Sequence, residues 1–264
     1  MKKILRFLTI IIFILGGLYI FSYFRYSDKT FILCYHKIDY YHGGLKSICV
    51  SPETFDRQMK FLVERGYRTV SLTELITLLN KKKGIPRKIF VITFDDGYEN
   101  NYKYAFPILK KYNFTATIFV TAGYIGKSYK YPGQPTEKHL TRKQIKEMNN
   151  YFEFGSHSLS HPKLTKISQK KLVFELQESK KIIEKIVGKQ VNHFCYPFGN
   201  YDESVKETLK PTGYRSACTT QIGLVDKNTN PFAFPRFEFK EWSAMSLKDF
   251  VKSIDFYLKI FFGL

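Results

Sequence analysis

Short apolar runs alternate with amphipathic stretches along this chain from Thr30 onward. The runs have the length and composition of buried strands, and the stretches between them are suited to helices. Strands that alternate with helices form a parallel sheet or barrel covered by helices, so we predict a single α/β domain over residues 30–264. The expected strands are 31–35, 89–94, 115–120, 152–155, 193–196 and 214–218.

Two helices have clear start and stop signals. Ser51 followed by Pro52 is typical of a helix start, because serine caps free N–H groups and proline fits the first turn. This helix should continue to about residue 65, since Gly66 follows. The longest helix is predicted over 168–187, where leucine and isoleucine recur near helical spacing before Gly188. Residues 123–140, rich in Gly, Pro and Tyr, are predicted to form a surface loop near the functional site.

The N-terminus carries an apolar run over residues 7–24, preceded by three basic residues and closed by Arg25. At about 18 residues, the run is near the lower limit for crossing a bilayer. We predict an uncleaved signal anchor over residues 1–29, with a cleaved signal peptide as the alternative. The basic residues before the run favour a cytoplasmic N-terminus. The rest of the chain would then be extracytoplasmic, on a single-pass transmembrane helix in the cell membrane.

The formal net charge of +19 favours contact with anionic cell-envelope polymers or lipid headgroups, although the lysines could equally just solvate helix faces. Export makes nucleic acid an unexpected partner. The four cysteines, Cys34, Cys49, Cys195 and Cys218, contain no CxxC pair and are too few for a disulfide scaffold. One disulfide and buried free thiols are equally compatible with their positions.

Two acidic residues, Asp95 and Asp96, directly follow the predicted strand 89–94 and precede Gly97. The carboxyl ends of strands are where α/β folds place their active sites. Adjacent carboxylates repel each other unless a cation or a hydrogen-bond donor compensates. The pair therefore indicates a functional pocket, although an ordinary Asp-Gly turn is the structural alternative.

Two histidines, His157 and His161, follow the predicted strand 152–155. Histidines four positions apart can converge on one metal ion if the segment makes a helical turn. Together with Asp96 they make a two-histidine, one-carboxylate set that leaves coordination positions open. Asp95 would then remain beside the metal, placed to take a proton from a water molecule.

These motifs resemble those of the polysaccharide deacetylases of carbohydrate esterase family 4, with residues 93–97 as the first motif and 157–161 as the second. The resemblance covers about residues 30–240 and implies a distorted (β/α) barrel with about seven repeats. It implies that Asp95 is the general base and that Asp96, His157 and His161 bind one divalent metal ion. Zinc is the first candidate, and cobalt, nickel and iron fit the same ligands.

Residues 31–36 and 51–55, with Gly66 and Tyr67, resemble the branch that deacetylates poly-β-1,6-N-acetylglucosamine. The resemblance therefore implies hydrolysis of N-acetyl groups from an extracellular polysaccharide, with release of acetate. The alternatives are a deacetylase of peptidoglycan or chitin-type chains and a catalytically silent polysaccharide-binding protein.

The segment 195–199 should reach the same rim of the fold and present the backbone N–H of Phe198 to an oxyanion. The family usually has an arginine where this chain has Cys195, and we predict that Arg236 replaces it. No histidine follows His193 to serve as the family's general acid, which leaves protonated Asp95 or a metal-bound water as candidates. His36, Tyr196 and Trp242 are the predicted substrate-binding residues.

Overall fold

The computed structural model describes residues 29–81, 84–130, 133 and 135–239. Its centre is a parallel sheet in the order β11-β10-β9-β6-β5-β1-β12, with a short additional strand, β4, paired to β5. The strands are β1 (Phe31–Tyr35), β4 (Arg68–Thr69), β5 (Ile89–Phe94), β6 (Thr117–Val120), β9 (Glu153–Ser156), β10 (His193–Cys195), β11 (Ser216–Cys218) and β12 (Phe237–Glu238). Parallel pairing places the carboxyl ends of all these strands at one rim of the sheet.

The segment before β12 brings the two edges of this sheet together. Phe234 forms a parallel bridge with Cys218 of β11, and three residues later Phe237 pairs with Leu33 of β1. The result is a distorted, incomplete parallel α/β barrel with seven strands along its continuous path, and the α/β class and distorted barrel expected from the sequence are confirmed.

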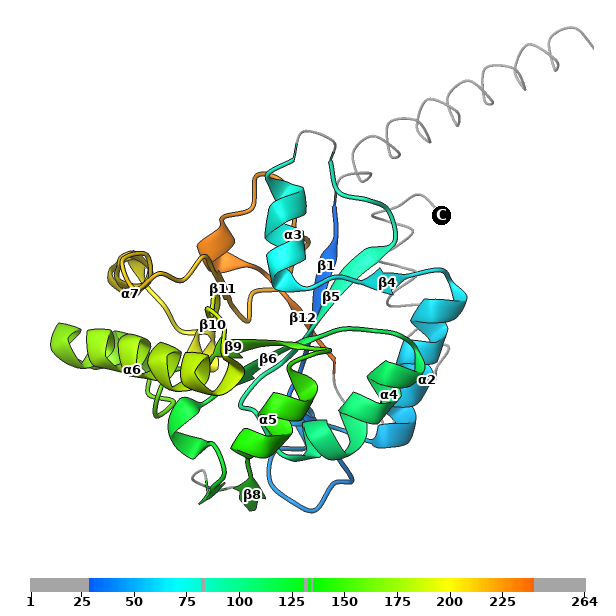
Figure 1. Ribbon diagram of the computed structural model, residues 1–264, viewed down its shortest axis with the longest axis horizontal. Coiled ribbons are helices and arrows are strands. Elements are labelled where there is room, and N and C mark those ends of the chain that lie inside the picture. Colours follow the sequence, from blue (N-terminus) through cyan, green and yellow to red (C-terminus); the bar gives the residue numbers. More distant parts are fainter. Residues whose placement is uncertain (1–28, 82–83, 131–132, 134, 240–264) are drawn as a thin grey trace, which may run out of the picture.

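The helices lie around the outside of the strands (Figure 1). Those of the described residues are α2 (Pro52–Glu64), α3 (Leu72–Leu79), α4 (Phe106–Lys111), α5 (Arg142–Met148), α6 (Gln169–Val187) and α7 (Glu203–Leu209). Apolar faces of these helices pack on the alternating side chains of the strands, which is how an α/β domain buries both layers.

Both helices with clear sequence signals are present at their predicted positions. The Ser51 side chain accepts a hydrogen bond from the Thr54 N–H at the start of α2. Ser168 does the same for Lys171 at the start of α6. Gly188 ends α6 in the left-handed conformation, at φ 71°, which glycine adopts without a steric penalty.

The segment 123–140 is more ordered than predicted from its composition. It contains an antiparallel hairpin of β7 (Ser128–Lys130) and β8 (Thr136–Lys138), preceded by a single helical turn, η3 (Ala122–Tyr124). Backbone hydrogen bonds attach the hairpin to the segment after β5, from Glu99 N–H to the Lys138 carbonyl and from Leu140 N–H to the Gly97 carbonyl, each 2.9 Å. The segment lies at the surface as predicted, but it forms a hairpin instead of a loop, because these backbone pairings are not visible in local composition.

The predicted signal anchor over residues 1–29 lies almost entirely outside the described residues, as does Trp242. Among the helices that the structure does describe, none combines the length and the apolar composition needed to span a membrane. The four cysteines are all buried with free thiols.

Candidate functional site

The acidic pair and the histidine pair meet at the carboxyl ends of β5 and β9. Asp95 and Asp96 follow the last residue of β5, and His157 follows the last residue of β9. The strand between them, β6, holds this arrangement, because the His157 N–H donates to the Val120 carbonyl at 2.9 Å. The shared rim of a parallel sheet thus brings together groups about 60 positions apart.

Three ligand atoms converge within this rim. The distance from Asp96 Oδ1 to His161 Nε2 is 3.3 Å, and that to His157 Nε2 is 3.6 Å. The two Nε2 atoms are 3.2 Å apart. All three lie within 4.8 Å of one another, a spacing that one metal ion can bridge.

The backbone reaches this geometry through left-handed residues. Asp96, Ser158 and His161 have φ values of 68°, 65° and 57°, which non-glycine residues adopt infrequently. Such conformations cluster at functional sites, where the surrounding structure offsets their cost. The helical turn predicted for residues 157–161 is absent, and these sharp bends bring the two imidazoles together instead.

The protonation states of the histidines suit a cation. Burial lowers the pKa of His157 and that of His161 to about 4 each, so both rings are neutral at pH 7. His157 Nδ1 lies 2.8 Å from the Cys195 carbonyl oxygen, and a neutral ring that donates there keeps the Nε2 lone pair toward Asp96. Asp96 Oδ1 is buried without a hydrogen-bond partner. A divalent cation could bind the Nε2 lone pair of His157 and the unpaired Oδ1 of Asp96. Together with the neutral ring of His161, these side chains therefore fit a metal ion.

Glu175 of α6 fixes the loop over residues 157–161, which carries both histidines and is called the histidine loop below. Its fully buried carboxylate accepts hydrogen bonds from the Leu159 N–H at 2.9 Å and from the Ser160 N–H and hydroxyl at 2.8 and 2.6 Å. Lys171 supplies a countercharge at 3.0 Å. Sequence reasoning missed this residue, although a glutamate inside the apolar stripe of a helix is a signal of a buried polar partner.

Asp95 lies next to the metal-ligand set and is bound by Arg236. The guanidinium donates two hydrogen bonds of 2.7 Å, one to each carboxylate oxygen. Burial alone would raise the pKa of Asp95, but the charge and hydrogen bonds of Arg236 outweigh it and hold the pKa of that carboxyl well below its usual range. Asp95 is therefore an anion at any physiological pH.

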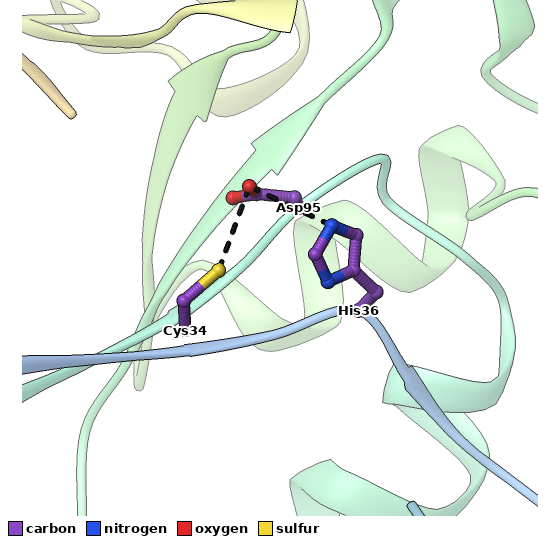
Figure 2. Close-up of side chains that lie close together, drawn as sticks. All are labelled: Cys34, His36 and Asp95. Carbon is purple, nitrogen blue, oxygen red and sulfur yellow. Dashed lines mark hydrogen bonds and ion pairs between the residues drawn. The ribbon is translucent and has the colours of Figure 1, made fainter. Parts of the chain in front are cut away.

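Two thiols and one imidazole complete the surroundings of Asp95. The Cys195 and Cys34 sulfurs lie 3.4 and 3.7 Å from Asp95 Oδ2. Figure 2 shows Cys34 and His36 approaching the carboxylate from consecutive parts of the chain at the end of β1. His36 Nε2 is 4.0 Å from the same oxygen, and its side chain is partly exposed.

One cleft of about 400 Å³ is lined by the two aspartates, by the imidazoles of the site and by aromatic rings. These residues are Asp95, Asp96, His36, His157, His161, Tyr98, Tyr196 and Phe198. Phe198 has φ 60° and is the second residue of the turn η5 (Pro197–Gly199), where an N–H has no acceptor within the turn. Its ring is half exposed and lies 4.6 Å from the His161 ring. The Tyr196 hydroxyl donates to the Phe232 carbonyl at 2.9 Å, so Tyr196 contributes its buried ring to the wall of the cleft.

Residues 82–217 match the polysaccharide deacetylase family. The chain belongs to this family. It is 34% identical over 209 residues to YxkH of Bacillus subtilis, a protein assigned to the same family, covering 79% of this chain and 70% of that protein.

Two further proteins are similar to this deacetylase. The poly-β-1,6-N-acetyl-D-glucosamine N-deacetylase of Staphylococcus aureus is 29% identical over 225 residues, covering 78% of this chain and 76% of the relative. The structure of the Streptococcus pyogenes deacetylase PplD, in complex with acetate, superposes with a TM-score of 0.75 at 27% identity. That superposition covers 85% of this chain and 97% of PplD.

The arginine of this deacetylase enters the site from the segment before β12, at the predicted residue Arg236. Cys195, at the end of β10, occupies the position where the family resemblance implies an arginine, and its sulfur lies 3.1 Å from Arg236 Nη2. Arg236 precedes β12 and also donates to the Thr219 carbonyl and the Thr93 hydroxyl. The structure thus places the Arg236 guanidinium against Asp95, with the smaller cysteine leaving room for it.

Proposed function

We propose that this deacetylase hydrolyses N-acetyl groups of N-acetylglucosamine units in an extracellular polysaccharide, releasing acetate and leaving free amines. The observation that carries the proposal is the meeting of Asp96, His157 and His161 beside the Arg236-bound Asp95 in one open cleft. We propose poly-β-1,6-N-acetylglucosamine as the polymer, supported by the similarity to the S. aureus enzyme that bears this name.

Asp96, His157 and His161 would hold one divalent metal ion, with zinc as the first candidate and cobalt, nickel and iron as the others. When bound, such an ion lowers the pKa of a water molecule and polarises a carbonyl oxygen. The residues supply the neutral imidazoles and the carboxylate that this chemistry requires. The hydrogen bond from His157 Nδ1 to the Cys195 carbonyl fixes the orientation of the His157 ring, so that its Nε2 faces Asp96.

Asp95 is the proposed general base. Because Arg236 keeps its carboxylate ionised, Asp95 is in the state that accepts a proton from an attacking water molecule. The same interaction argues against protonated Asp95 as the proton donor to the leaving amine. His36 is the better candidate for that donor, since it faces the cleft and its Nε2 lies 4.0 Å from Asp95 Oδ2.

The tetrahedral oxyanion would be stabilised by the backbone N–H of Phe198. This N–H belongs to a left-handed residue on a proline-rigidified turn at the edge of the cleft. A fixed N–H donor costs little reorganisation when negative charge develops on the substrate oxygen. The Tyr196 ring, behind the turn, supports its position through stacking on Tyr201 at 4.6 Å.

Acetate release from purified polymers tests the proposal. The substrates are β-1,6-linked N-acetylglucosamine oligomers, peptidoglycan and chitin oligomers, each with chelator and then with single metals restored. We expect release from the β-1,6 oligomers that chelator abolishes and one divalent metal restores. Acetate release that stays the same when chelator is added would contradict the mechanism. Unchanged acetate release by an Asp95→Ala variant would contradict it as well.

We also propose that residues 1–29 tether the enzyme to the membrane with the catalytic domain outside the cytoplasm, where the basic surface meets anionic envelope polymers. The apolar run over 7–24 and the basic residues before it support this location. Fractionation of cells that produce the full chain, compared with a variant lacking residues 1–29, tests it. Full-length protein in the soluble cytoplasmic fraction would overturn the proposal.

A further inference from the structure

A second, smaller cavity of about 130 Å³ lies beside the catalytic cleft. Its walls are the loop over residues 39–43 and the hairpin strand β8, with Lys37 at its inner side. Lys37 directly follows His36 of the cleft, and its ammonium lies 5.6 Å from the centre of the Tyr98 ring, which lines the cleft. The two hollows are therefore neighbours on the same rim of the barrel.

Two tyrosines at this cavity are exposed but held in place. Tyr40 and Tyr41 are 47% and 50% exposed. The Tyr40 hydroxyl donates to Glu53 at 2.6 Å, and its ring packs edge-on against Tyr104 at 6.0 Å. The Tyr41 hydroxyl donates to the Gly44 carbonyl at 3.0 Å. Rings anchored at their polar ends present fixed apolar surface to solvent, which is suited to stacking against the C–H face of a sugar.

The polar groups of the cavity can bind sugar hydroxyls. Lys37 is buried and paired with Glu137 at 2.7 Å, which joins the inner wall to β8. The Asp39 carboxylate accepts from the Tyr40 N–H at 2.8 Å and from Asn100 Nδ2 at 3.4 Å. A carboxylate has about four acceptor positions, so Asp39 retains capacity for the hydroxyl or amine donors of a ligand.

Resting on the proposed function, we infer that this cavity binds the hexosamine unit next to the one being deacetylated. Tyr40 and Tyr41 would stack on that unit, and Asp39 would accept hydrogen bonds from it. A second sugar site on the same rim gives the enzyme a means to prefer a polymer over a single sugar, because remote contacts supply binding energy that positions the reacting acetamide.

The test compares kcat/KM for acetate release from the β-1,6 pentamer with that from the N-acetylglucosamine monosaccharide. We expect the pentamer-to-monosaccharide ratio to fall about 2- to 10-fold in Tyr40→Ala and in Tyr41→Ala, the range of one aromatic contact. Tyr41→Phe keeps the ring and should keep most of the ratio. Tyr151→Ala, which removes a similarly exposed tyrosine outside both cavities, is the matched control.

A ratio that stays the same in both alanine variants, with thermal melting unchanged, would overturn the inference. If the wild-type chain released no acetate from any substrate, the proposed function would fail by itself. Calorimetric binding of the pentamer, which needs no turnover, would then decide the sugar site. Weaker binding by Tyr41→Ala than by Tyr151→Ala would support the site, and equal binding would overturn it.

Discussion

Arg236 and Asp95 form a buried ion pair with two hydrogen bonds of 2.7 Å, although 141 positions separate them in the chain. The pair joins the segment before β12 to the end of β5. It therefore contributes both to closing the barrel and to the charge state of the proposed base. Replacing one of the two residues by a neutral one leaves a buried charge without a countercharge. This is far more destabilising than replacing both residues.

We predict that Arg236→Met lowers the free energy of unfolding by about 3 to 5 kcal/mol, the cost of a buried uncompensated charge. The double variant Asp95→Asn with Arg236→Met should be more stable than Arg236→Met alone, because neither charge remains. Urea unfolding of the single and double variants measures both effects. A double variant no more stable than Arg236→Met would show that the ion pair is not the cause.

Glu175→Gln should weaken metal binding about 10- to 100-fold, the usual effect of disturbing groups that orient metal ligands. The glutamine amide nitrogen cannot accept the Ser160 hydroxyl hydrogen bond that Glu175 Oε1 accepts, and the neutral amide no longer pairs with Lys171, so the loop carrying His161 loses its fixed position. Competition with a chromogenic chelator measures the affinity. Glu178→Gln, on an exposed part of the same helix, is the control, and equal affinities in the two variants would refute the role of Glu175.

Metal binding should stabilise the fold by an amount that grows with the logarithm of the free metal concentration above Kd. At a free metal concentration 100 times Kd, the expected gain is about 2.7 kcal/mol, because the ion binds the folded chain alone. Thermal melting with and without zinc measures it. Asp96→Asn should reduce the gain strongly, whereas Asp56→Asn on the outside of α2 should leave it intact. A similar gain in both variants would place the bound metal elsewhere.

Acid stability should depend on Glu153 at the start of β9. Burial alone would raise the pKa of Glu153, but His193 and Thr73 outweigh burial and lower it to about 2. Because this pKa is below that of the unfolded chain, Glu153 stabilises the fold fully above about pH 4.5, and this contribution is lost as the pH falls toward 2. The contribution is at most about 3 kcal/mol.

Urea unfolding between pH 3 and pH 7 measures this dependence. Glu153→Gln should be less stable than the wild type at pH 7 and should lose less stability on acidification. Glu203→Gln, on the exposed side of α7, should follow the wild-type curve. A Glu153→Gln variant that loses as much stability in acid as the wild type would contradict the prediction.

Local sequence patterns predicted the elements well where the signal was itself local. The apolar runs at 31–35 and 89–94 coincide with β1 and β5, and Ser51 and Ser168 cap the helices that they were expected to cap. Strand lengths and helix caps depend on neighbouring residues, which the sequence displays directly. The hairpin of β7 and β8 was missed because its composition is typical of a loop, and its attachment to the segment after β5, about 40 positions earlier, is a long-range contact.

The sequence by itself determined which chemical groups stand at the active rim. An acidic pair after one buried strand and a histidine pair after another must share that rim, because parallel strands align their carboxyl ends. The sequence, through the family resemblance, also suggested Arg236 as the arginine of the site. Only the tertiary structure decided its contact with Asp95 and the other supporting groups, which are Glu175 for the histidine loop and the Cys195 carbonyl for His157. Such partners depend on strand register and packing between distant segments, which no periodicity along the chain encodes.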